Sequence, residues 1–137
     1  MKNAIRIETI VHKSINMVWE FWTLPIHIKK WNKASDNWHT TIAENDLKVG
    51  GRFLSRMEAK DGSLGFDFKG TYTAIVAKES ISYVLDDDRK VTTNFTSLEP
   101  NKTQIVSIFE AETINPIEMQ KGGWQAILDN FKKYTEA

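Results

Sequence analysis

The chain contains no cysteine among its 137 residues. Disulfide bonds, thiolate metal sites and cysteine nucleophiles are therefore excluded together. A chain of this length buries roughly 70% of the surface that it exposes when unfolded, so one core is stable without such cross-links. We expect a single domain that spans residues 1–137.

Neither sign of charge is in excess, because 18 lysine and arginine residues balance 18 aspartate and glutamate residues. A balanced chain has no overall field that attracts nucleic acid or an anionic membrane. The sequence also lacks a long apolar run, and its start, MKNAIRIETIV, alternates polar and apolar residues, unlike a signal peptide or membrane span. We expect a cytoplasmic protein that binds neither nucleic acid nor membrane, as a monomer or a weak homodimer.

Motifs for metals and phosphates are missing as well. The three histidines, His12, His27 and His39, lack the spacing of a zinc site. The run Asp86–Asp88 lacks the glycine and glutamate of a calcium loop, and a solvated turn explains it. Gly50-Gly51 is not followed by the Gly-Lys-Ser/Thr of a phosphate loop. We expect no metal and no cofactor.

Strand patterns occupy most of the chain. Residues 5–11 alternate apolar and polar side chains, which predicts a strand. From Trp38 onward, alternating segments are separated by the turn signals Asp61-Gly62, Asp86–Asp88 and Pro100–Lys102. Hairpin-length turns of this kind predict an antiparallel meander.

Three helices are expected around this meander. Ser14 is a good cap for a short helix, and Pro25 suits the first turn of a second one that ends near Trp31. Near the end of the chain, apolar residues recur with helical spacing at Trp124, Ile127, Leu128, Phe131 and Tyr134. We expect this terminal helix to begin near Gly122, with Gly122-Gly123 forming the turn that leads into it.

One helix, about 10–12 Å across, does not cover six or seven strands that lie about 4.8 Å apart. The sheet must therefore curl around the terminal helix, and Gly50, Gly51 and Gly70 are candidate bend positions. This geometry leaves an elongated cavity between the helix and the concave face.

Several short motifs, in order along nearly the whole chain, resemble one family. They are Val18-Trp19, Ile28–Trp31, Asp46–Phe53, Gly70–Tyr72, Lys102–Ile105 and Gly122–Leu128. Together they are similar to the START/SRPBCC superfamily, and within it to the branch related to the activator of the heat-shock protein 90 ATPase. Asn32 departs from the pattern, because the family often has a second tryptophan there.

The resemblance implies an α+β helix-grip fold. In this fold a curved antiparallel sheet of six to seven strands surrounds a long C-terminal helix, and two short helices follow the first strand. The superfamily includes lipid carriers, polyketide cyclases and protein-binding modules, so the resemblance implies a fold more firmly than a function.

The candidate ligand site consists of side chains expected on the concave face or its rim. They are Trp31, Trp38, Phe53, Phe66, Phe68, Tyr72, Phe95, Ser107, Phe109, Trp124 and Leu128. The alternative for each aromatic residue is packing in an ordinary core. Ser55, Thr93 and Ser107 alternate in phase with apolar neighbours, which favours an apolar pocket with a few hydroxyl groups. Arg52 and Arg56 have the opposite phase and should point outward.

Two functions remain open. The first is the binding of a small hydrophobic or aromatic ligand in the cavity. The alternative, implied by the resemblance, is a co-chaperone-like module that binds a chaperone-like protein partner. A cyclase-type enzyme that uses Tyr72 or His27 for acid–base chemistry is less supported, because no paired carboxylates or activated nucleophile accompany them.

Overall fold

The computed structural model describes residues 1–137 and contains seven strands and three helices. The elements follow the order expected from the sequence, with two short helices after the first strand and one long helix after the meander. In chain order they are β1 (Ala4–Val11), α1 (Ile15–Thr23), α2 (Pro25–Trp31), β2 (Trp38–Asn45), β3 (Arg52–Ala59), β4 (Gly65–Val76), β5 (Ser80–Leu85), β6 (Lys90–Glu99), β7 (Lys102–Glu110) and α3 (Ile117–Glu136).

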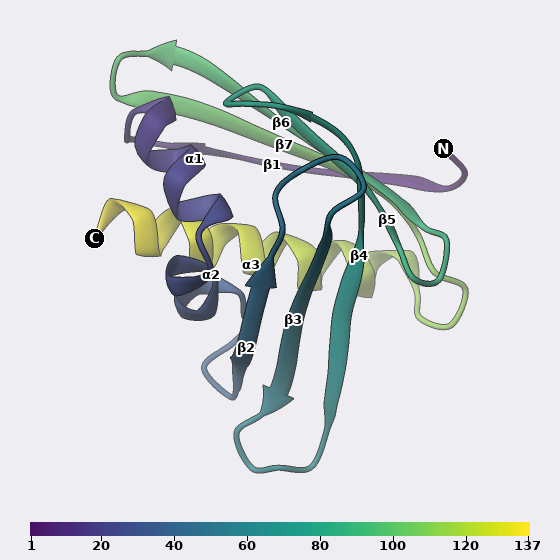
Figure 1. The fold of residues 1–137 in the computed structure, drawn as a ribbon. Helices are drawn as coiled ribbons and strands as arrows, with labels where there is room; N and C mark the ends of the chain where they lie inside the picture. Colours follow the sequence, from purple (N-terminus) through teal and green to yellow (C-terminus); the bar gives the residue numbers. More distant parts are fainter.

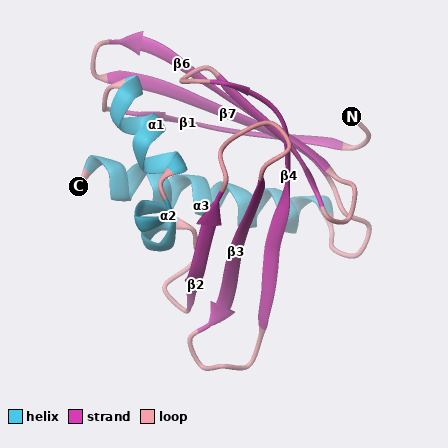
Figure 2. Cartoon of the chain, in the orientation of Figure 1, coloured by secondary structure: helices cyan, strands magenta, loops and turns pink.

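All seven strands form one antiparallel sheet in the order β1-β7-β6-β5-β4-β3-β2. In Figure 1, β1, β6 and β7 cross the upper part of the molecule while β2, β3 and β4 descend below them, with α3 passing along the inner side. Figure 2 shows all three helices on this inner side of the curled sheet. The prediction of an α+β helix-grip fold with six to seven strands is therefore confirmed, and the number is seven.

The short helices begin where the capping residues indicated. The Ser14 side chain accepts the backbone N–H of Met17 at 3.3 Å, and Pro25 occupies the first turn of α2. Trp31 at the end of α2 stacks on Trp22 of α1, with ring centroids 5.0 Å apart. These contacts join α1 and α2 into one unit that closes one end of the curled sheet.

The curl of the sheet requires a glycine in β4. Gly70 pairs with Phe53 of β3 and Leu85 of β5. A Cβ at residue 70 would lie 2.5 Å from the Val84 carbonyl oxygen and 3.1 Å from the Phe53 ring, so no other residue fits without a shift. The other expected bend positions, Gly50 and Gly51, lie in the connection between β2 and β3.

The apolar core lies between the concave face and α3. Leu128 and Phe131 of α3 are buried against strand residues that include Ile105 and Phe109 of β7. The apolar stripe predicted from Trp124 onward therefore faces the sheet.

The terminal helix begins earlier than the sequence indicated. α3 starts at Ile117, directly after Pro116, so Gly122 and Gly123 lie inside the helix. The expected turn at these glycines was wrong. The reason is that the first turn of α3 carries no inward-facing stripe: Ile117 and Met119 are 46% and 62% exposed.

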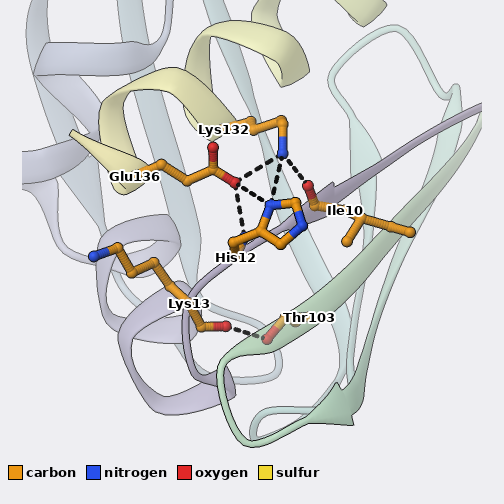
Figure 3. Close-up of polar contacts among 6 residues, drawn as sticks. All are labelled: Ile10, His12, Lys13, Thr103, Lys132 and Glu136. Carbon is orange, nitrogen blue, oxygen red and sulfur yellow. Dashed lines mark hydrogen bonds and ion pairs between the residues drawn. The ribbon is translucent and has the colours of Figure 1, made fainter.

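A polar cluster fastens the last turn of α3 to the end of β1 (Figure 3). Lys132 donates to the Ile10 carbonyl and, at 2.7 Å, to the Glu136 carboxylate. The same carboxylate accepts the backbone N–H of His12 at 2.7 Å and lies 3.1 Å from its ring Nδ1. Burial opposes ionisation of Glu136, but the hydrogen bonds from Lys132 and His12 outweigh it and lower its pKa to about 2.

The two helical glycines lead to a first prediction. A Cβ at Gly122 or Gly123 meets no atom within 4 Å. Because glycine inside a helix is less stable than alanine by about 0.5–1 kcal/mol, G122A and G123A should each raise the free energy of unfolding by about that amount in urea titrations. Gly70→Ala is the matched control and should destabilise the fold, because its Cβ meets backbone. A loss of stability in both helical variants would contradict the placement of these residues within α3.

Glu136 leads to a prediction of pH dependence. A carboxyl group with a lowered pKa in the folded state stabilises the fold above its unfolded pKa, and this contribution disappears as the pH falls to the folded value. For Glu136 the window runs from the ordinary value of 4.5 down to about 2. Glu136→Gln should lower the free energy of unfolding at pH 7 by on the order of 1 kcal/mol, after allowance for screening by solvent.

The difference between Glu136→Gln and the unmodified protein should therefore shrink between pH 4.5 and pH 2 in denaturant titrations. Glu20→Gln on the exposed side of α1 is the control and should show no such convergence. A stability difference that stays constant over this pH range would show that the charge of Glu136 is not responsible.

Candidate functional site

A cavity of about 330 Å³ lies between α3 and the concave face of the sheet. Fourteen of its 25 lining residues are hydrophobic, which makes its wall mostly apolar. The wall is built by residues of all seven strands, all three helices and the loops between them, including the β7–α3 loop. A volume at the lower end of the range for ligand pockets, about 300–1,000 Å³, suits a small molecule.

Most of the residues predicted for the site line this cavity. They are Trp31, Phe53, Phe66, Phe68, Tyr72, Ser107, Trp124 and Leu128. Ser55 and Thr93, the other hydroxyl residues of the expected phase, line it too. Arg52 and Arg56 point outward and form ion pairs on the convex face.

Three predicted residues lie outside the cavity wall. Phe109 is fully buried behind Trp124, on which it stacks at 3.9 Å with an interplanar angle of 8°. Phe95 is buried and packs edge-on against Trp19 of α1 at 5.5 Å. Trp38 is half-buried at the start of β2 and does not reach the cavity. Strand alternation predicts which face a side chain occupies, but it does not show whether another side chain covers it.

Trp124 forms the centre of the aromatic wall. Besides its stack on Phe109, it receives Phe68 edge-on, with ring centroids 5.7 Å apart. The Phe53 ring lies 5.8 Å from Phe68 and 4.8 Å from Tyr83. Stacked and edge-on pairs of this kind stabilise aromatic clusters beyond simple burial. The rings of α3, β3, β4 and β5 therefore form one continuous apolar surface.

Several polar groups of the wall bind one another. The Tyr72 hydroxyl donates to Asn45 Oδ1, and Asn45 Nδ2 donates to the Thr23 carbonyl at 2.7 Å. Burial raises the pKa of Tyr72, and the hydrogen bond to Asn45 opposes this. The hydroxyls of Thr93 and Ser107 lie 2.8 Å apart and share a hydrogen bond. These groups hold β2, β4, β6 and β7 in place.

Gln120 closes the end of the cavity beside the β7–α3 loop. Its Nε2 donates to the carbonyls of Glu112 at 3.1 Å and Asn115 at 2.8 Å, and its Oε1 accepts the N–H of Glu112 at 2.8 Å. The Glu112 carboxylate accepts the backbone N–H of Asn115 at 2.7 Å. All three residues line the cavity, and the sequence interpretation did not include them. A buried glutamine between two exposed residues carries no periodic signal.

Tyr83 and Arg89 line the cavity and were also missed. The Tyr83 hydroxyl has no hydrogen-bond partner in the protein, and burial raises its pKa, with Tyr72 adding to the rise and Arg89 opposing it. The Arg89 Nε donates to Asp87 at 2.8 Å, while the two terminal nitrogens of the guanidinium form no hydrogen bond or ion pair within the protein. Tyr83 shares the phase of Ile81, and this alternation was the signal that could have found it.

The histidines lie away from the cavity. His27 Nδ1 is 2.7 Å from the Tyr134 hydroxyl, and its ring stacks on Phe21 at 3.9 Å. His12 belongs to the cluster at the end of α3. No group of three or more histidine, aspartate or glutamate side chains is arranged to hold a metal ion. None of the three helices combines the length and apolar content required to cross a membrane.

Comparisons with known proteins agree with this architecture. The sequence profile of the family described as "Activator of Hsp90 ATPase homolog 1-like protein" matches residues 12–136. The solution NMR structure of the AHSA1-like protein from Aeromonas hydrophila is similar, with 49% sequence identity, a TM-score of 0.90, and coverage of 97% of this chain and 92% of that chain.

A solution structure from Cytophaga hutchinsonii has 48% identity and a TM-score of 0.84, and the match covers 98% of this chain and 92% of that one. A crystal structure from Chromobacterium violaceum shares the fold, with a TM-score of 0.87 at 23% identity, over 100% of this chain and 99% of that one. No protein with a curated functional description matches.

The resemblance inferred from the motifs is thus confirmed. With a profile that matches residues 12–136 and an AHSA1-like structural relative at 49% identity, the chain belongs to the Activator of Hsp90 ATPase homolog 1-like family, a family of the SRPBCC type.

Proposed function

We propose that the protein binds a small hydrophobic or aromatic ligand in the cavity between α3 and the curled sheet. The observation that carries the proposal is the cavity of about 330 Å³ with its predominantly hydrophobic wall. Pockets for small molecules typically combine such a wall with a few polar groups. We further propose that the protein is cytoplasmic and is a monomer or a weak homodimer.

The size of the cavity supports a binding role over a packing defect. Protein interiors are close-packed, and an unfilled apolar cavity lowers the free energy of unfolding by about 24 cal/mol for each Å³. For 330 Å³ of dry, enclosed space this would amount to about 8 kcal/mol, and water that enters this half-open cavity lowers the cost. A space of this size favours a ligand as the reason for its existence.

Three tryptophans, Trp22, Trp31 and Trp124, line the cavity and provide the readout for a binding experiment. A flat aromatic compound that enters should quench or shift their fluorescence. A library of fatty acids, flavonoids and naphthalene derivatives should contain ligands of micromolar affinity, about −8 kcal/mol. Trp124→Phe should remove a large part of the signal if the ligand lies against α3.

Filling the cavity should weaken this binding more than it weakens folding. Ser55 is the best position, because its hydroxyl lines the cavity and has no hydrogen bond to lose. Ser55→Leu should weaken the library ligands by about tenfold or more, since a ligand must give up the space of the added methyl groups. Ser97→Leu, on the exposed end of β6, is the matched control and should leave affinity unchanged.

Two results would overturn the ligand-binding proposal. If the full library changes neither the fluorescence nor the thermal midpoint of the unmodified protein, the cavity is not a site for small hydrophobic molecules. Equal affinities of Ser55→Leu and Ser97→Leu would show that the ligands bind elsewhere on the surface.

A co-chaperone-like role is the second candidate, and an exposed apolar group favours it. Ile114 is 87% exposed in the β7–α3 loop, and Ile117 and Met119 are exposed in the first turn of α3. Contiguous apolar side chains on a surface often mark protein-binding sites. The family description, Activator of Hsp90 ATPase homolog 1-like protein, supports a chaperone as the partner.

This candidate is tested with a purified Hsp90-type chaperone. If the role is correct, the protein should raise the ATPase rate of the chaperone, and the double variant I117S/M119S should abolish the increase because it removes the apolar contact. Ser55→Leu is the control and should still activate. Failure of the unmodified protein to bind or stimulate the chaperone would exclude this role and leave ligand binding as the function to pursue.

A further inference from the structure

Tyr83 and Arg89 are brought together on the concave face by the β5–β6 hairpin. Tyr83 pairs with Val91 in the register of these strands, and the Leu85 N–H donates to the Arg89 carbonyl at 2.8 Å just beyond the paired residues. Arg89 stands two residues before Val91, which is buried, so the two side chains lie on the same inward face of the sheet. Two positions related in this way are diagonal neighbours, about 7–8 Å apart, within reach of long side chains.

Both side chains have hydrogen-bonding capacity that the protein does not use. The Tyr83 hydroxyl makes no hydrogen bond, and the Arg89 guanidinium engages only through Nε, with Asp87. The Arg89 side chain is 22% exposed, so most of it lies away from bulk solvent. Neither residue is among the fully buried polar atoms without a partner, which comprise Thr135 Oγ1 alone, so the Tyr83 hydroxyl and the free Arg89 donors are accessible to a molecule in the cavity.

The other charged groups of the cavity are placed differently. Arg89 is the only cationic side chain in the wall, and Glu44 and Glu112 are the acidic ones. Glu44 is exposed on β2, and the Glu112 carboxylate accepts two hydrogen bonds from Asn115, at 2.7 Å and 3.3 Å. The cationic group with free donors is thus Arg89.

We propose that the ligand of this cavity carries a carboxylate, which the guanidinium of Arg89 and the hydroxyl of Tyr83 bind while the apolar body lies against Phe68 and Trp124. The inference rests on the proposed ligand-binding function. The guanidinium has two parallel N–H donors that match the two oxygens of a carboxylate. The Phe68 ring lies 6.4 Å from Tyr83 and 5.7 Å from Trp124, so the apolar wall is continuous with the polar pair.

The hydroxyl of Tyr83 is suited to this role at neutral pH. A phenol with the ordinary pKa of 10 is already protonated at neutral pH, and burial moves the pKa of Tyr83 further upward, so its hydroxyl is able to donate a hydrogen bond to an anion. Tyr72, the neighbouring phenol in the cavity, already donates to Asn45 and is not available. The structure thus distinguishes two tyrosines of the same wall by their partners.

The test compares 2-naphthoic acid with methyl 2-naphthoate, which lacks the negative charge and is larger by one methyl group. Affinities are measured by tryptophan fluorescence and by calorimetry. The acid should bind the unmodified protein about tenfold more tightly than the ester, because hydrogen bonds to a charged group are stronger than neutral ones. Arg89→Met should abolish this preference and leave ester affinity within about twofold. Tyr83→Phe should weaken the acid about threefold or more.

Two further variants act as controls. Lys90→Met removes a charge from the adjacent, outward-facing position and should leave the preference for the acid intact. Asp87→Asn removes the carboxylate that competes for Arg89, and it should tighten the acid without affecting the ester. The second variant keeps the test decisive if Arg89→Met does not fold.

The outcomes separate this inference from the function on which it rests. If the ester and the acid bind equally to the unmodified protein, the carboxylate inference is wrong while ligand binding stands. If the acid is preferred but Arg89→Met keeps that preference, or Asp87→Asn weakens the acid, Arg89 is not the anchor. If neither probe nor any library member binds, the proposed function itself fails.

Discussion

The difference in width between one helix and a seven-stranded sheet determines the rest of this structure. A helix about 10–12 Å wide covers about two strands of a flat sheet, so the sheet must curl for its apolar face to be buried. Gly70 permits the necessary approach of β3, β4 and β5. Even after curling, α3 does not fill the interior, and a cavity of about 330 Å³ remains. The space for a ligand is thus a geometric result of the fold, and the side chains decide its chemistry.

The position of α3 relative to the sheet is fixed at both of its ends. At its start, Gln120 makes three hydrogen bonds to the β7–α3 loop. At its end, Lys132 and Glu136 bind the last residues of β1 and the residue that follows. Between these ends, burial of Leu128 and Phe131 supplies the apolar contact. Directional contacts at the ends set the register of the helix, whereas burial in the middle supplies most of its stability.

The sequence predicted the fold because strand and helix periods are local properties. Alternation placed Phe68 and Ser55 on the concave face, and both line the cavity. Depth is not a local property, and Phe109 lies behind Trp124 although its phase is the same. Polar residues that act through a long-range partner, such as Gln120, were missed for the same reason. Arg89 was missed because it stands at the edge of a turn, where no pattern assigns a face.

The β5–β6 turn links the inside of the molecule to its convex surface. Asp86 in this turn pairs with Arg52 on the outer face at 2.8 Å, while the next residue, Asp87, pairs with the inward-facing Arg89. Adjacent residues of one short turn therefore form ion pairs with arginines on opposite faces of the sheet. The ion pair on the convex face and the ion pair at the cavity wall are thus joined through a single peptide bond, that between Asp86 and Asp87.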